Sequence, residues 1–157
     1  MKRILLPTDF SDISVNAIKY ATQLFTNIPC EFYVLNVYRI PYLANEELMD
    51  QNVSQLSAME DEMHESSKKG MEKILSQLPE NKLHIFETIS DYNLFSLAVH
   101  QAVEEKEIEL IIMGTKGATG SREIFMGSNT ADVIMRNACH VMAVPENHSF
   151  KPPKEIL

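Results

Sequence analysis

Short apolar runs alternate along the chain with segments of helical periodicity, and this alternation constrains the fold more than any other feature of the sequence. Runs suited to buried strands lie at 2–7, 31–38, 82–89, 108–113 and 141–144. Apolar residues at helical spacing fill the intervals, at 11–28, 53–78, 93–105 and 128–138. Parallel strands need a crossover helix between them, so this order predicts an α/β fold with a five-stranded parallel sheet and helices on both faces.

The second helical segment, 53–78, differs from the others in its apolar stripe. Ser66, Ser67 and Gly70 interrupt the stripe in the middle, and we expect a bend near Gly70. At about 1.5 Å per residue the segment is longer than the sheet is wide. Part of this helix should therefore extend beyond the core.

Length and composition indicate one globular domain. The chain has 157 residues, 45% hydrophobic and 23% charged, which suits a single hydrophobic core. We expect a domain over 1–146 and a C-terminal tail, 147–157, with little structure of its own. The net charge of −8 disfavours binding to nucleic acid or to an anionic membrane. No apolar run approaches the roughly 20 residues of a membrane span and no signal peptide is recognisable, so we expect a cytoplasmic protein.

Cysteines and histidines carry no recognisable chemistry. Cys30 and Cys139 lie far apart, without the spacing of a metal or redox motif, and the five histidines are scattered. Neither a zinc site nor a catalytic triad is predicted.

A glycine-bearing loop after the fourth expected strand is the strongest candidate for a functional site. Gly114, Gly117 and Gly120 are followed by Gly127, and then by Ser128 at the start of a helix. Glycine lets backbone N–H groups approach an anion closely, and the first N–H groups of a helix are unpaired and carry partial positive charge. The loop therefore predicts a phosphate cradle, although the glycines alone fit a plain connection equally well.

Two further observations bear on this loop. Lys116 and Arg122 add positive charge to it, either for phosphate or as solvated surface charges. The loop contains neither a Walker A motif nor the G-x-G-x-x-G pattern of dinucleotide-binding proteins, so those two classes are disfavoured.

The turn after the first strand is the second candidate. Asp9 is explained by turn formation ahead of a helix capped by Ser11, or by ligand contact. In doubly wound sheets, ligands bind beyond the carboxyl ends of the strands where the strand order reverses, which favours the second explanation.

The spacing Gly-x2-Gly-x9-Gly-Ser, met by Gly114, Gly117, Gly127 and Ser128, resembles the ATP-binding signature of the universal stress protein family. The resemblance extends to the PTDFS turn at 7–11, the IIMGT run at 111–115 and the CHVMAVP run at 139–145, and so covers nearly the whole chain.

This resemblance implies a Rossmann-like sheet of order 3-2-1-4-5. It implies that Asp9 contacts the nucleoside, that backbone near Val37 meets the adenine, and that the glycine loop holds the triphosphate of ATP, usually with Mg²⁺ or Mn²⁺. The expected nucleotide-binding residues are Pro7, Thr8, Asp9, Val37, Met113, Gly114, Lys116, Gly117, Arg122, Gly127, Ser128 and Asn129.

The function expected from these residues is an ATP-binding regulator of the stress response. Since the sequence offers no dedicated general base, hydrolysis should be slow at most, and no catalytic residue is assigned. The alternative is a nucleotide-free interaction module of the same fold. The resemblance also implies a homodimer through the last strand, His140–Val144, whose open apolar edge would otherwise favour aggregation.

Overall fold

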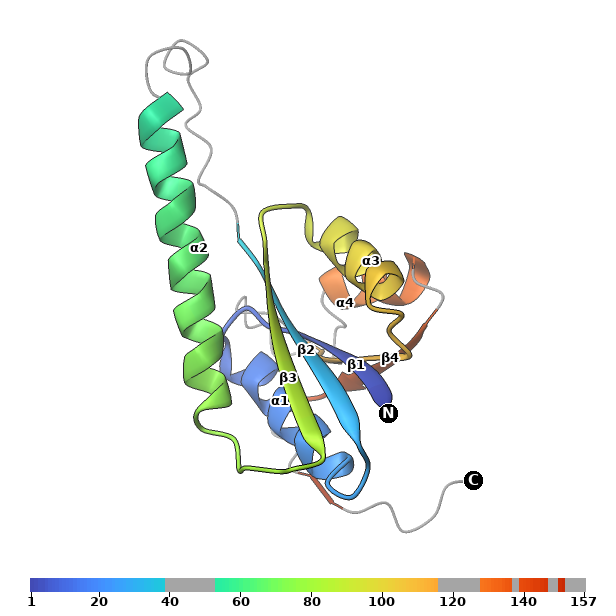
Figure 1. Cartoon of the computed structure of the whole chain (residues 1–157). Coiled ribbons are helices and arrows are strands. Elements are labelled where there is room, and N and C mark those ends of the chain that lie inside the picture. Colours follow the sequence, from blue (N-terminus) through green and yellow to red (C-terminus); the bar gives the residue numbers. More distant parts are fainter. Residues whose placement is uncertain (39–52, 116–127, 137–138, 147–149, 152–157) are drawn as a thin grey trace.

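The computed structural model describes residues 1–38, 53–115, 128–136, 139–146 and 150–151, and its centre is a five-stranded sheet (Figure 1). All the strand pairs are parallel, and the strand order is β3-β2-β1-β4-β5. The predicted fold class and strand order are therefore confirmed. The strands are β1 (Lys2–Pro7), β2 (Cys30–Val37), β3 (His84–Asp91), β4 (Leu110–Gly114) and β5 (His140–Val144).

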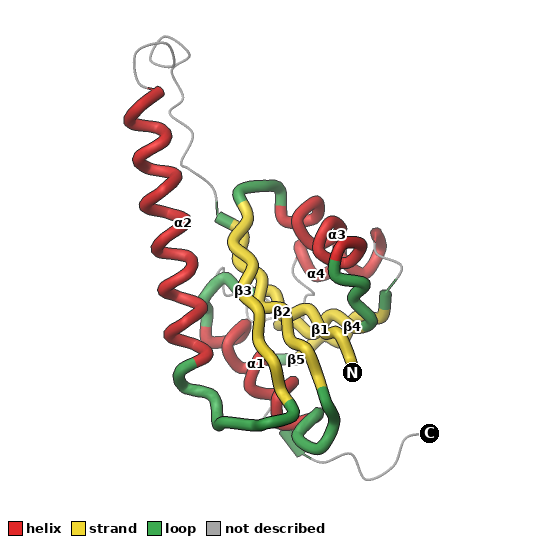
Figure 2. Tube along the Cα trace, viewed as in Figure 1, coloured by secondary structure: helices red, strands yellow, loops and turns green. Residues whose placement is uncertain are grey.

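Helices cover both faces of this sheet, as Figure 2 shows. Two of them, α1 and α2, lie on one face, and α3 and α4 lie on the other. Within the described ranges, no helix is long and apolar enough to cross a membrane. The helices are α1 (Asp12–Leu24), α2 (Val53–Leu75), α3 (Phe95–Glu105) and α4 (Ser128–Arg136).

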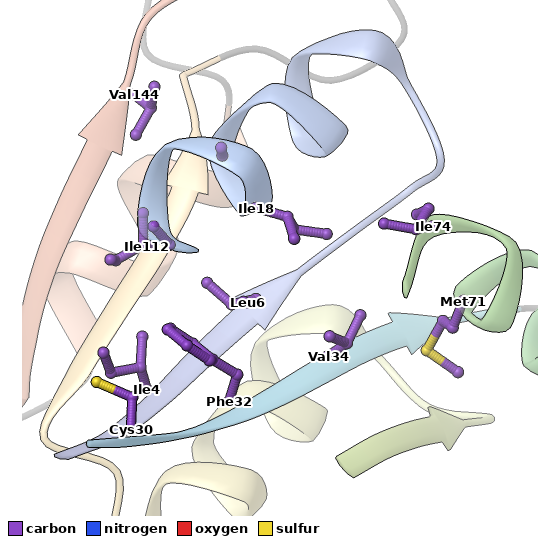
Figure 3. Close-up of a cluster of buried hydrophobic side chains, with 12 residues drawn as sticks. Ile4, Leu6, Ile18, Cys30, Phe32, Val34, Met71, Ile74, Ile112 and Val144 are labelled. Carbon is purple, nitrogen blue, oxygen red and sulfur yellow. The ribbon is translucent and has the colours of Figure 1, made fainter. Parts of the chain in front are cut away.

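Alternation along the strands divides the buried side chains into two cores. On β1, Ile4 and Leu6 point to the α1 and α2 side, where they meet Ile18 (Figure 3). Leu5, between them, belongs to the opposite core with Val99 of α3. All five of these side chains are fully buried. Strands buried on both faces are therefore nearly continuous in apolar sequence, as the sequence analysis expected.

Only part of α2 packs on the sheet, as predicted from its length. Residues 57–66 are exposed apart from Met63, which is half-buried, and burial begins at Ser67. Met71 and Ile74 then enter the core (Figure 3). In Figure 1 the first half of α2 stands clear of the sheet, and the whole helix, Val53–Leu75, runs straight, so the expected bend is not found.

In its described part, the C-terminal segment contacts the domain through Phe150. Phe150 packs edge-on against Tyr20 of α1, with ring centroids 5.5 Å apart. The remainder of the expected tail, 147–149 and 152–157, lies outside the described residues.

Candidate functional site

The strand order reverses direction between β1 and β4. Strands β2 and β3 lie on one side of β1. The chain then returns through the crossover helix α3, and β4 lies on the other side of β1. The register pairs Ile4 with Leu110 and Leu5 with Ile111, so both strands end at the same edge of the sheet. The turn after β1 and the segment after β4 therefore start side by side, as the switch-point argument predicts.

The turn after β1 is held by a backbone hydrogen bond to β2 and by the Thr8 side chain. Thr8 is buried, and its N–H donates to the carbonyl of Leu35 at 2.8 Å. The Phe10 N–H donates to Thr8 Oγ1 at 3.0 Å. Phe10 has φ of 64°, a left-handed conformation that bulky side chains rarely adopt. This turn is thus tightly specified, and it reverses the chain into α1.

Asp9 is exposed at the tip of this turn and also shapes it. Its Oδ1 accepts hydrogen bonds from the N–H and the hydroxyl of Ser11. Ser11 in turn caps α1, because its Oγ accepts from the Ser14 N–H at 3.3 Å. The turn-forming explanation of Asp9 is therefore correct locally, and the same geometry keeps the carboxylate at the carboxyl end of the sheet.

Gly114, the last residue of β4, has no room for a side chain. A Cβ there would lie 2.5 Å from Cγ2 of Ile13, in the first turn of α1. Its carbonyl accepts a hydrogen bond from Thr130 Oγ1 at 3.0 Å. Besides the close approach of an anion predicted from the sequence, this glycine meets a packing requirement, because β4, α1 and α4 converge at this residue.

The N-terminal end of α4 is anchored to this corner by Thr130. That side chain is buried, and Asn129 beside it is exposed. The first N–H groups of a helix have no partner within the helix, so they are available to an anion or to water. The sequence pattern indicated Ser128 and Asn129 but not Thr130, whose local signal is no more than a hydroxyl in the first turn of a helix.

The end of β2 borders the same edge of the sheet. Val37 is half-buried and pairs with Asp91 of β3. The next residue, Tyr38, places its hydroxyl 3.3 Å from Nδ1 of His64 on α2. Burial raises the pKa of Tyr38, and the nearby carboxylates, Glu60 foremost, raise it further. Its phenol is therefore neutral at physiological pH.

Asn36 and Ser67 are two further buried polar residues at this edge that sequence analysis missed. Asn36 Nδ2 donates to the carbonyl of Thr8 at 2.8 Å. Ser67 Oγ donates to Asn36 Oδ1 at 2.7 Å. Asn36 could have been found from the sequence, because it is a lone asparagine inside the apolar run of β2 and a buried amide needs hydrogen-bond partners.

Part of the predicted site is not described. Lys116, Gly117, Arg122 and Gly127 lie outside the described residues, so their predicted contacts stay predictions. Among the residues that the structure does describe, no group of three or more His, Cys, Asp or Glu side chains is arranged to hold a metal ion.

Comparison with known proteins agrees with this architecture. The model of the universal stress protein family matches residues 1–145. Universal stress protein MJ0531 of Methanocaldococcus jannaschii is 28% identical over 98% of this chain and 85% of its own length. The solved structure of protein MJ0577, from the same organism, superposes with a TM-score of 0.77 at 26% identity, over 94% of this chain and 98% of that one.

Two more distant structures share the fold and contain an adenine nucleotide. A universal stress protein in complex with cAMP has a TM-score of 0.58 at 16% identity, covering 92% of this chain and 96% of its own. A family protein from Arabidopsis thaliana with AMP bound has a TM-score of 0.53 at 15% identity, covering 94% and 93%. With the family model matching nearly the whole length, this chain belongs to the universal stress protein family.

Proposed function

We propose that this protein binds ATP at the edge of the sheet where β1 and β4 end, and that nucleotide occupancy regulates it in a cytoplasmic stress response. The observation that carries the proposal is the convergence at Gly114. The first turn of α1, which follows the Asp9 turn, the end of β4 and the N-terminal end of α4 come together there. The AMP and cAMP complexes of two family members support an adenine nucleotide as the ligand.

Each part of the site has a role in this proposal. Asp9 contacts the nucleoside, the backbone at Val37 meets the adenine, and Pro7 and Thr8 shape the pocket between them. Backbone N–H groups from Gly114 to Asn129 hold the phosphates, with Mg²⁺ or Mn²⁺ bound through phosphate oxygens. Lys116 and Arg122 add positive charge that an ATP anion needs in a chain of net charge −8.

Binding, rather than turnover, is the activity that the described residues support. Asp9 Oδ1 already accepts two hydrogen bonds from Ser11, so this exposed carboxylate is engaged in the turn. A general base must be within hydrogen-bond reach of an attacking water. We therefore propose slow hydrolysis at most, with no dedicated catalytic residue.

We also propose a homodimer through β5. This strand, His140–Val144, pairs with β4 on one side and is the last strand in the order. An open strand edge is a template for pairing with a second copy. Light scattering checks the stoichiometry: a mass twice that of the chain supports the proposal, and a monomer at micromolar concentration rejects it.

Titration calorimetry with ATP and Mg²⁺ tests the nucleotide proposal. Binding is expected for the wild type and is expected to be lost in Gly127→Val, because a branched side chain obstructs the approach of an anion to the backbone. Absence of heat, and of any melting shift at millimolar ATP, would leave the alternative, a nucleotide-free interaction module of the same fold.

A further inference from the structure

One face of α2 contacts the residues that flank the proposed nucleoside pocket. His64, Ser67 and Gly70 follow each other at intervals of three along the helix, so they lie along one ridge. Each touches a different neighbour of the pocket: Tyr38, Asn36 and Phe10, in that order. Tyr38 and Asn36 bracket Val37, and Phe10 follows Asp9.

The middle contact is a hydrogen-bond chain with a defined direction. The Ser67 hydroxyl has one hydrogen, which it donates to Asn36 Oδ1. The 2.7 Å contact between the hydroxyls of Ser67 and Ser90 must then be donated by Ser90. Asn36 passes the chain on through Nδ2, which donates to the Thr8 carbonyl. A path of hydrogen bonds thus runs from β3 and α2 to the turn that carries Asp9.

Burial makes this path costly to break. Asn36 is 5% exposed, Ser67 3% and Thr8 6%. Without the Ser67 hydroxyl, the side-chain oxygen of Asn36, Oδ1, loses its hydrogen-bond donor. Water cannot easily replace that donor at such low exposure. Among the described residues, only its own Nδ2 bond to the Thr8 carbonyl then orients the amide, so the amide can turn away from Thr8 more easily.

The contact between Gly70 and Phe10 stabilises the same turn at the residue that follows Asp9. A Cβ at Gly70 would lie 2.7 Å from Cε1 and Cζ of Phe10, so the ring rests directly on the helix backbone. Because Phe10 holds a left-handed φ of 64°, its contact with α2 helps to maintain a backbone conformation that is unfavourable for a phenylalanine.

These contacts explain the polar interruption in the apolar stripe of α2. Ser67 precedes Met71 by four residues and Ile74 by seven, so it continues the buried stripe in the direction of the strand ends. At Ser67 and Gly70 the helix packs against Asn36 and Phe10, beside the turn after β1, and no longer against the apolar core. The interruption therefore marks where the helix meets the site.

We infer that α2 is the positioning element of the nucleoside half of the site, and that Ser67, acting through Asn36, sets the conformation of the Thr8–Asp9 turn and with it the affinity for the nucleotide. This inference rests on the proposed function and extends it. By thermodynamic reciprocity, nucleotide binding stabilises the docking of α2.

The test compares Ser67→Ala with Ser66→Ala, a matched control at the exposed neighbouring position. Hydrogen exchange of the nucleotide-free proteins is followed by NMR at the amides of Phe10 and Ser11. Their hydrogen bonds, to Thr8 Oγ1 and Asp9 Oδ1, depend on the turn. We expect exchange about tenfold faster in Ser67→Ala and unchanged in Ser66→Ala. A tenfold change in exchange rate corresponds to the free energy of about one buried hydrogen bond.

An amide at the opposite end of the sheet separates positioning from general loss of stability. The Ile28 N–H donates to the Phe25 carbonyl at 2.9 Å, far from the turn, and its exchange should not change. Uniform acceleration at Ile28 and Phe10 overturns the inference, as does equal exchange in the two serine variants. If Ser67→Ala does not fold, Ser90→Ala should give a smaller acceleration at the same turn amides, and no acceleration there overturns the inference.

Calorimetry with ATP and Mg²⁺ then separates this inference from the proposed function. Wild type and Ser66→Ala should bind alike, with Ser67→Ala about tenfold weaker. If the wild type binds ATP and Ser67→Ala binds equally well, the positioning role fails and the nucleotide proposal stands. If the wild type does not bind, the nucleotide proposal fails, and the exchange data alone decide whether α2 positions the turn.

Discussion

The ring of Phe10 lies directly against Gly70, where a Cβ would come within 2.7 Å of two ring atoms. This contact packs α2 against the turn that follows β1. Since Phe10 follows Asp9, we expect the packing of α2 and the conformation of the proposed nucleoside contact to depend on each other.

Gly70→Ala tests that dependence. The alanine should raise helix propensity by about 1 kcal/mol, while its methyl group displaces the Phe10 ring, which is 40% exposed and has space to move. We therefore expect little net change in melting temperature together with clearly weaker ATP binding in calorimetry. Lys69→Ala, exposed on the same helical turn, is the control. Unchanged ATP affinity in Gly70→Ala contradicts the dependence.

Replacement of Asp9 separates its two roles. Asp9→Ala removes the acceptor of both Ser11 hydrogen bonds, so melting temperature and nucleotide affinity should both fall. Asp9→Asn keeps an acceptor oxygen, so its stability should stay closer to that of the wild type. We expect ATP affinity to drop about tenfold or more in Asp9→Ala, which is about 1.4 kcal/mol. Wild-type affinity in both variants, measured by calorimetry, removes Asp9 from the site.

Gly114→Ala should destabilise the fold by about 1–3 kcal/mol, because its Cβ would lie 2.5 Å from Ile13 Cγ2. Ile13→Ala removes that methyl group, so in urea unfolding the double variant should be less destabilised than the sum of the two single variants. The relief should be partial, since the Ile13 carbonyl oxygen would still lie 3.3 Å from the new Cβ. Strict additivity would show that this clash is not what requires glycine.

Thr130→Val removes the hydrogen bond to the Gly114 carbonyl without changing the size of the side chain. With Thr130 only 3% exposed, we expect a loss of about 1–3 kcal/mol in unfolding free energy and weaker ATP binding, because α4 loses its link to β4. Thr22→Val is the matched control: Thr22 is also buried, and its hydroxyl bonds the Lys19 carbonyl within α1. Equal ATP affinity in the two variants would show that the Thr130 link does not shape the site.

The sequence predicted the local elements well because their signals are local. Proline closes β1, and Ser11 caps α1 through the Ser14 N–H three residues later. Periodicities of 2.0 and 3.6 residues identified the strands and helices, and the family resemblance supplied the order 3-2-1-4-5. The ends of the elements shifted by a few residues at most, as for β3, which was expected at 82–89 and runs from His84 to Asp91.

Contacts between distant residues could not be predicted in this way. Ser67 and Asn36 are 31 positions apart, and their hydrogen bond exists only because α2 packs over the end of β2. Taken alone, a serine in the middle of a helix indicates a weakness in the apolar stripe. The clash that any side chain at position 114 would make with Ile13 could not be predicted for the same reason, since it depends on how closely α1 crosses β4.

The location of the ligand is the central claim, and amide NMR measures it directly. In a titration of the ¹⁵N-labelled protein with ATP and Mg²⁺, the largest shift changes should fall on Thr8 to Ser11, Val37 and Tyr38, Met113 to Thr115, and Ser128 to Thr130. The amides at the opposite end of the strands, such as Ile28 and Leu83, should not move. Shift changes confined to that opposite end, or no changes at saturating ATP, would contradict the account.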